Sequence, residues 1–171
     1  SCLERVRDDP NISLYCVHRE SRSVAFVETL PGIDYHAASL SYQAQRNNAV
    51  AIHELSLEEF GRVAADIRVA GTGVLLIYSV GRCGSTLLHH ILNRCTGVRS
   101  LSEPDFISSV QQLGAGFPKP AKLDLLRDGA RMLVLKSQAR DSLLAIKLRS
   151  ENCGLWEMLD FAFEQPRAMF M

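Results

Sequence analysis

A glycine-rich segment with one cationic and two hydroxyl side chains is the part of the chain best suited to chemistry. It reads Gly81-Arg82-Cys83-Gly84-Ser85-Thr86 and lies between an apolar run and a predicted helix. Glycines let the backbone turn tightly and bring its N–H groups close to a ligand. The first N–H groups of a helix lack partners within the helix, and the helix dipole adds partial positive charge. With the Arg82 charge and the two hydroxyls, the segment predicts a cradle for an anion the size of a phosphate.

Two other interpretations of this loop are open. An ordinary strand–turn–helix corner with a capping serine needs no ligand, although an arginine inside the loop has no purpose in such a corner. A Walker A loop requires a glycine where Ser79 stands and a lysine where Ser85 stands. The missing lysine counts against an ATPase or GTPase, because that lysine contacts the β- and γ-phosphates.

Together with a second segment, the loop resembles the sulfotransferase family. The second segment reads Leu101-Ser102-Glu103-Pro104-Asp105 and follows the loop after one predicted helix. The resemblance covers residues 74–171, and Cys83 departs from the serine that is commoner in the family. It implies a P-loop-like domain that transfers a sulfuryl group from 3′-phosphoadenosine 5′-phosphosulfate (PAPS). The acceptor would be a hydroxyl or amine of a small molecule or carbohydrate, and no metal would be required.

The resemblance also implies a role for each matching residue. Arg82 would stabilise negative charge on the sulfuryl group and on the departing phosphate. The cradle for the 5′-phosphosulfate end of the donor would be completed by Gly81, Cys83, Gly84, Ser85 and Thr86. Glu103 would be the general base that takes the proton of the acceptor. Its alternative role is a negative charge at the start of the helix predicted from Asp105. A P-loop kinase or NTPase and a non-catalytic phosphate-binding module of the same fold are the alternative functions.

Other polar residues lie near the same predicted site. His89 and His90 are one turn into the predicted helix, and neighbours on a helix point about 100° apart. At most one of them can therefore face the loop, and satisfied or exposed histidines are expected at both positions. Lys147, Arg149 and Ser150 close a predicted strand, at the end where sites form in α/β proteins. They are candidates for binding the donor or the acceptor, or they are solvated residues of a strand end.

Strands and helices alternate from residue 74 onward, which predicts an α/β fold with a three-layer parallel sheet. The apolar run 74–80 predicts a buried strand, and 85–96 predicts a helix that turns Leu87, Leu88, Ile91, Leu92 and Cys95 inward. Further strands are predicted at 98–101, 143–148 and 167–171, and further helices at 105–113, 121–138 and 153–163. We divide the chain into an N-terminal α+β extension, 1–70, and the sulfotransferase-like domain, 71–171. The extension contains predicted strands at 12–18, 22–29 and 49–55, and a helix that Ser56 and Glu59 begin with a capping box.

The composition narrows the class of protein. The 171 residues include 19 basic and 19 acidic side chains, and this zero net charge argues against a general nucleic-acid or anionic-membrane binder. The longest apolar run, Val74 to Tyr78, is far shorter than the roughly 20 residues of a membrane span. Five scattered cysteines show no zinc-ligand spacing and favour free thiols in a reducing compartment, which predicts a cytoplasmic location.

The chain stops at Met171, inside the last predicted strand. In the sulfotransferase family, an arginine and a serine beyond that strand hold the 3′-phosphate of the donor. The sequence therefore predicts a fragment that is incomplete at its C-terminus, carries the phosphosulfate half of the site and is inactive alone.

Overall fold

The fold is an α/β arrangement of two sheets that share one core. The computed structural model describes residues 2–68, 71–137 and 143–171. The elements in chain order are α1 (Cys2–Asp8), β1 (Ile12–His18), β2 (Ser23–Thr29), α2 (Ser41–Asn47), β3 (Ala49–Ser56), α3 (Leu57–Ala65), β4 (Gly73–Tyr78), α4 (Ser85–Leu92), β5 (Val98–Ser102), α5 (Asp105–Gln111), α6 (Lys119–Lys136), β6 (Leu143–Lys147), the 3₁₀ helix η1 (Ser150–Leu155), α7 (Trp156–Ala162) and β7 (Arg167–Phe170).

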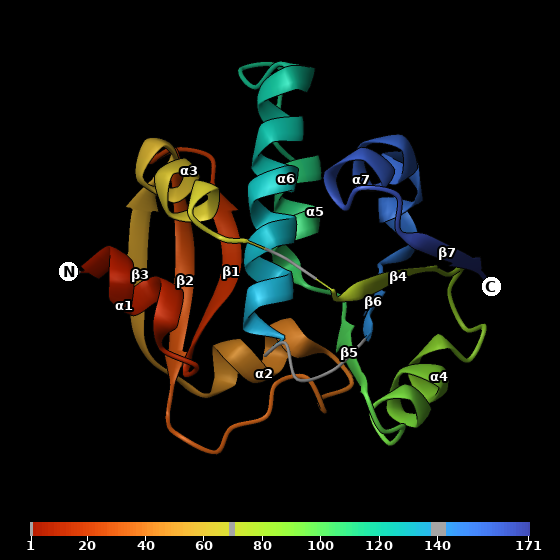
Figure 1. The fold of residues 1–171 in the computed structure, drawn as a ribbon. Helices are drawn as coiled ribbons and strands as arrows, with labels where there is room; N and C mark the ends of the chain where they lie inside the picture. Colours follow the sequence, from red (N-terminus) through yellow and green to blue (C-terminus); the bar gives the residue numbers. More distant parts are fainter. Residues whose placement is uncertain (1, 69–70, 138–142) are drawn as a thin grey trace.

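The parallel sheet has the strand order β5-β6-β4-β7, and the antiparallel sheet has the order β1-β2-β3. Helices flank the parallel sheet, with α4 against β5 and β6 and α7 against α6 (Figure 1). In the register of the parallel sheet, Ile77 and Ser102 both pair with Lys147. The chain segments that follow β4, β5 and β6 therefore leave the sheet at one common edge, which is where ligands bind in open α/β sheets.

The N-terminal elements pack on the rest of the chain through α5 and α6, which lie between the two sheets (Figure 1). A row of aromatic rings crosses this contact. Phe26 of β2 lies 5.9 Å from Phe60 of α3, and Phe60 lies 6.0 Å from Phe106 of α5, centroid to centroid. All three side chains are fully buried, so residues on both sides of the predicted boundary at residue 70 belong to one hydrophobic cluster. Residues 69–70 themselves lie outside the described part of the chain.

Most of the predicted elements are confirmed, including the capping box in which Ser56 and Glu59 satisfy each other's backbone N–H groups. Three details of the prediction are corrected: the end of the first strand of the parallel sheet, the burial of its last strand, and the buried face of helix α4. The first strand of the parallel sheet ends at Tyr78, and Val80 is exposed. The last predicted strand, β7, pairs with β4 at one edge of the sheet and is exposed along its length, whereas a strand of a parallel sheet is expected to be covered on both faces. The predicted end of α6 at Gln138 lies outside the described residues.

The buried face of α4 is the third correction. The sequence pattern predicts that Leu87 and Ile91 face inward, but their exposed fractions are 66% and 50%. Ser85 and His89 are buried instead. The side of α4 that packs carries His89, whose ring makes hydrogen bonds with Ala38 and Ser100.

Gly129 in α6 allows Phe106 to reach its place in the core. A Cβ added at Gly129 would lie 2.0 Å from the Phe106 ring. Alanine favours a helix over glycine by ~1 kcal/mol, but overpacking a core costs about 1–3 kcal/mol, so we expect Gly129→Ala to lower the free energy of unfolding. Gly61→Ala in α3 is the matched control, since its Cβ would meet only Asp128 Oδ2 at 3.6 Å. Urea unfolding that shows both variants equally stabilised would contradict this packing.

Candidate functional site

A cleft of about 310 Å³ opens at the common edge where β4, β5 and β6 end. Its walls come from three chain segments: the loop after β4, the residue after β5, and the residues from the end of β6 into η1. The lining residues are Ser79, Val80, Gly81, Arg82, Ser85, Thr86, Glu103, Lys147, Leu148, Arg149, Ser150 and Glu151. The structure thus brings the predicted loop, Glu103 and the predicted strand-end cations together around one cavity.

The loop after β4 has the backbone of a tight turn into a helix. Gly84 is the N-cap of α4 with a φ of 86°, a left-handed conformation that glycine adopts without strain. Arg82 also has a positive φ, 64°, and its side chain is exposed. Ser85 begins α4 and is buried, and Thr86 follows it on the wall of the cleft. Gly84 has no side chain that could cap α4, and the donors of Ser85 in the first turn face Cys83.

Cys83 lies against these donors. Partial burial by itself raises the pKa of the Cys83 thiol, but hydrogen bonding from Ser85, from the backbone N–H of Cys83 and from Ser79 outweighs it. The net pKa lies below the usual value for a thiol, because the donors stabilise the thiolate. The same donors are suited to any other anion that enters the loop.

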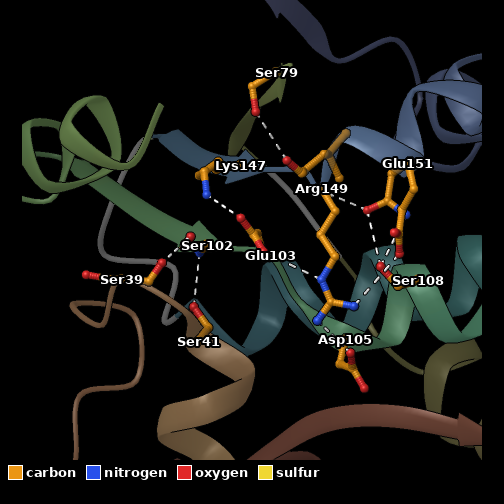
Figure 2. A network of polar contacts seen from close by, with 12 residues as sticks. Ser39, Ser41, Ser79, Ser102, Glu103, Asp105, Ser108, Lys147, Arg149 and Glu151 are labelled. Carbon is orange, nitrogen blue, oxygen red and sulfur yellow. Dashed lines mark hydrogen bonds and ion pairs between the residues drawn. The ribbon is translucent and has the colours of Figure 1, made fainter. Parts of the chain in front are cut away.

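Glu103 is held between two cations, as Figure 2 shows. Its Oε1 accepts a hydrogen bond from Lys147 Nζ, and its Oε2 lies 3.6 Å from Arg149 Nε. The Lys147 side chain is only 4% exposed, and Glu103 is the counter-charge that accompanies it. The backbone supports the pairing as well, because the Glu103 N–H donates to the carbonyl of Lys147 at 2.7 Å and Glu103 has a φ of 53°.

The contacts of Glu103 separate its two predicted roles. Helix α5 begins at Asp105 with Pro104 as its N-cap, and no side chain caps it. The carboxylate of Glu103 instead contacts Lys147 and Arg149 and lines the cleft. Asp105 is the acidic residue of the first turn of α5, and it accepts a hydrogen bond from Arg149 at 2.8 Å.

Neither histidine lines the cleft. The His89 ring is fully buried, where Nε2 donates to the carbonyl of Ala38 at 3.0 Å and Nδ1 accepts from the Ser100 hydroxyl at 2.8 Å. Burial lowers the pKa of His89, which keeps the ring neutral. His90 Nε2 lies 3.0 Å from the Ser39 hydroxyl. Both histidines therefore attach α4 to the segment before α2.

Sequence reasoning missed the contribution of that N-terminal segment, residues 38–42. The Ser102 hydroxyl donates to the carbonyl of Ser39 at 2.7 Å, and the Ser102 N–H donates to the Ser41 hydroxyl at 3.0 Å (Figure 2). The ring of Tyr42 lies 4.4 Å from the Arg149 guanidinium carbon. No local pattern marks Ala38, Ser39, Ser41 and Tyr42, since each contacts a partner more than 50 positions further along the chain.

Comparisons with known proteins identify no relative. No family model matches the chain, and no curated protein or solved structure is significantly similar to it. Within the described ranges, no group of three or more histidine, cysteine or acidic side chains is placed to hold a metal ion. None of the described helices has the length and apolar character needed to cross a membrane.

The position of Cys83 predicts selective alkylation. Because its pKa is lowered, a larger fraction of Cys83 is thiolate at pH 7.5 than for an ordinary cysteine, and thiolates are the reactive form. We expect iodoacetamide to modify Cys83 before Cys95 or Cys153, which are more exposed. Cys16 should stay unmodified in the folded protein, because burial raises its pKa to about 12. Peptide mass spectrometry at several pH values measures the order, and faster labelling of Cys95 would contradict it.

The Lys147–Glu103 pair predicts asymmetric effects on stability. Glu103→Ala leaves the Lys147 charge buried without its counter-charge, and breaking a buried pair in this way costs about 3–5 kcal/mol. Lys147→Met removes the buried charge and should cost less. The double variant should recover part of the loss of Glu103→Ala, as coupled sites do. Urea unfolding measures all three free energies, with Glu151→Gln on the cleft rim as a control, and additive losses in the double variant would contradict the coupling.

Proposed function

We propose that this chain is part of a sulfotransferase. It would bind the phosphosulfate end of PAPS in the cleft, and the enzyme would transfer the sulfuryl group to a hydroxyl or amine. The observation that carries the proposal is the placement of the Arg82 loop and the Glu103 carboxylate on the walls of one cavity. A transferase of this kind needs an anion cradle and a base close together, and the cleft offers both.

The loop fits the anionic end of the donor. Arg82 makes no ion pair with any described residue, so its guanidinium is available to a ligand. The Ser85 and Thr86 side chains line the same wall as Arg82 and add hydroxyl donors. A ligand that approaches the start of α4 also meets the partial positive charge of the helix N-terminus. The P-loop-like role of this segment rests on that chemistry and on its position between β4 and α4.

Glu103 is the candidate base. In the proposed reaction the acceptor oxygen or nitrogen forms a bond to sulfur while the bond from sulfur to the phosphate oxygen breaks. The acceptor proton passes to the Glu103 carboxylate, and 3′,5′-ADP leaves with the negative charge. Arg82, Lys147 and Arg149 line the cleft around this step, and fixed cations stabilise the charge that develops on the sulfuryl and phosphate oxygens.

Ligand selectivity tests the proposal. Isothermal titration should show that 3′,5′-ADP binds without Mg²⁺ and that Mg²⁺ does not tighten it, because the cleft supplies its own cations. A kinase or NTPase would prefer Mg·ATP, and a protein that binds only Mg·ATP would overturn the proposal. In the full-length protein, a non-catalytic module would bind 3′,5′-ADP but transfer no sulfuryl group from PAPS, whether residue 103 is Glu or Gln.

Arg82→Ala should weaken 3′,5′-ADP binding by about tenfold to a hundredfold, since a hydrogen bond to a charged group contributes about 1.5–3 kcal/mol. Thr86→Ala should raise the dissociation constant less. Where transfer from PAPS is followed, Arg82→Ala should slow it about 10²- to 10³-fold. Arg94→Ala is the matched control, because Arg94 is exposed and lies outside the cleft. Equal affinities for the Arg82 and Arg94 variants would argue against the loop as the binding site.

A further inference from the structure

The guanidinium of Arg149 is enclosed by groups from two other parts of the chain, helix α2 and residues 103–105. The Tyr42 ring covers one face at 4.4 Å, Asp105 Oδ1 accepts from one terminal nitrogen at 2.8 Å, and Glu103 Oε2 lies 3.6 Å from Nε. The backbone of Arg149 is fixed too, because its N–H donates to Asn152 Oδ1 at 3.1 Å. The side chain is 20% exposed, and Arg149 is one of the residues that line the cleft.

The segment that carries Tyr42 is itself anchored to the elements around the cleft. The carbonyls of Ala38 and Ser39 accept hydrogen bonds from His89 of α4 and from Ser102 of β5. Ser41, next to Tyr42, accepts from the Ser102 N–H. Tyr42 is therefore held in position by strand β5, which Glu103 follows, and by the helix that begins at the loop after β4.

We propose that Tyr42 is a positioning residue that fixes the Arg149 guanidinium toward the cleft, so that residues 38–42 complete the anion site. This inference rests on the proposed function and adds to it a role for the N-terminal part of the chain. An arginine side chain loses rotational freedom when it binds an anion, and a guanidinium already stacked on a ring has less freedom left to lose. The carboxylates hold two edges of the guanidinium, and the Tyr42 ring covers one of its faces.

A double-mutant cycle on the whole protein tests the inference, with 3′,5′-ADP as the probe. A cation–π contact is worth about 0.5–2 kcal/mol, so Tyr42→Leu should weaken binding by about two- to thirtyfold. Tyr42→Phe keeps the ring and should bind like the parent. In an Arg149→Gln background, Tyr42→Leu should have no further effect, because the residue through which it acts is gone. Parental affinity in Tyr42→Leu, or an undiminished loss in the Arg149→Gln background, would overturn the inference.

A spectroscopic measurement separates this inference from the proposed function. The aromatic ring current should shift the Nε–H proton signal of Arg149, assigned by its loss in Arg149→Gln. The shift should persist in Tyr42→Phe and disappear in Tyr42→Leu, with or without a ligand. If the parent protein binds no 3′,5′-ADP, the proposed function fails, and this signal alone decides whether Tyr42 positions Arg149. An Arg149 signal that is identical in the parent and in Tyr42→Leu would overturn the inference.

Discussion

The ammonium group of Lys147 is a buried charge at the end of the central strand β6, and the cleft is organised around neutralising it. Burying a charge is costly unless a counter-charge and hydrogen bonds accompany it. Glu103 supplies the counter-charge from the neighbouring strand end, with its backbone N–H bonded to the carbonyl of the same lysine. The left-handed backbone of Glu103 turns the chain from β5 toward α5 at this point. A non-glycine residue in that conformation is strained, and both of its contacts with Lys147 help to hold it there.

The parallel register explains why one charge can organise residues so far apart in the sequence. Because β4, β5 and β6 end together, the residues after them meet without long loops. The loop after β4 needs the glycine at position 84, while Glu103 and Arg149 need only to follow their strands. The antiparallel sheet contributes through Phe26, which packs on Phe60 of α3, and Phe60 packs on Phe106 of α5. These contacts hold the first turn of α5, where Phe106 directly follows Asp105.

Those parts of the site that follow from local patterns could be predicted from the sequence. Apolar runs and the capping box at Ser56 identified strands and helices, and the glycine-rich segment from Gly81 to Thr86 indicated the turn between β4 and α4. The predicted inward face of α4 was wrong, because the buried side of this helix carries His89, which makes hydrogen bonds with Ala38 and Ser100. Tyr42 could not be found, since a cation–π contact across more than 100 residues leaves no periodic or compositional trace.

The attachment of residues 38–42 to the cleft has a consequence for how the chain can vary. Two of its bonds use main-chain carbonyls, those of Ala38 and Ser39, and every amino acid carries that acceptor. Their partners, the His89 ring and the Ser102 hydroxyl, are side-chain donors that few residue types can replace. Substitutions at position 38 can therefore accumulate without loss of the contact, whereas the histidine and the serine are constrained by it. Divergent versions of this protein would keep the donors on α4 and β5 and differ in the segment that those donors hold.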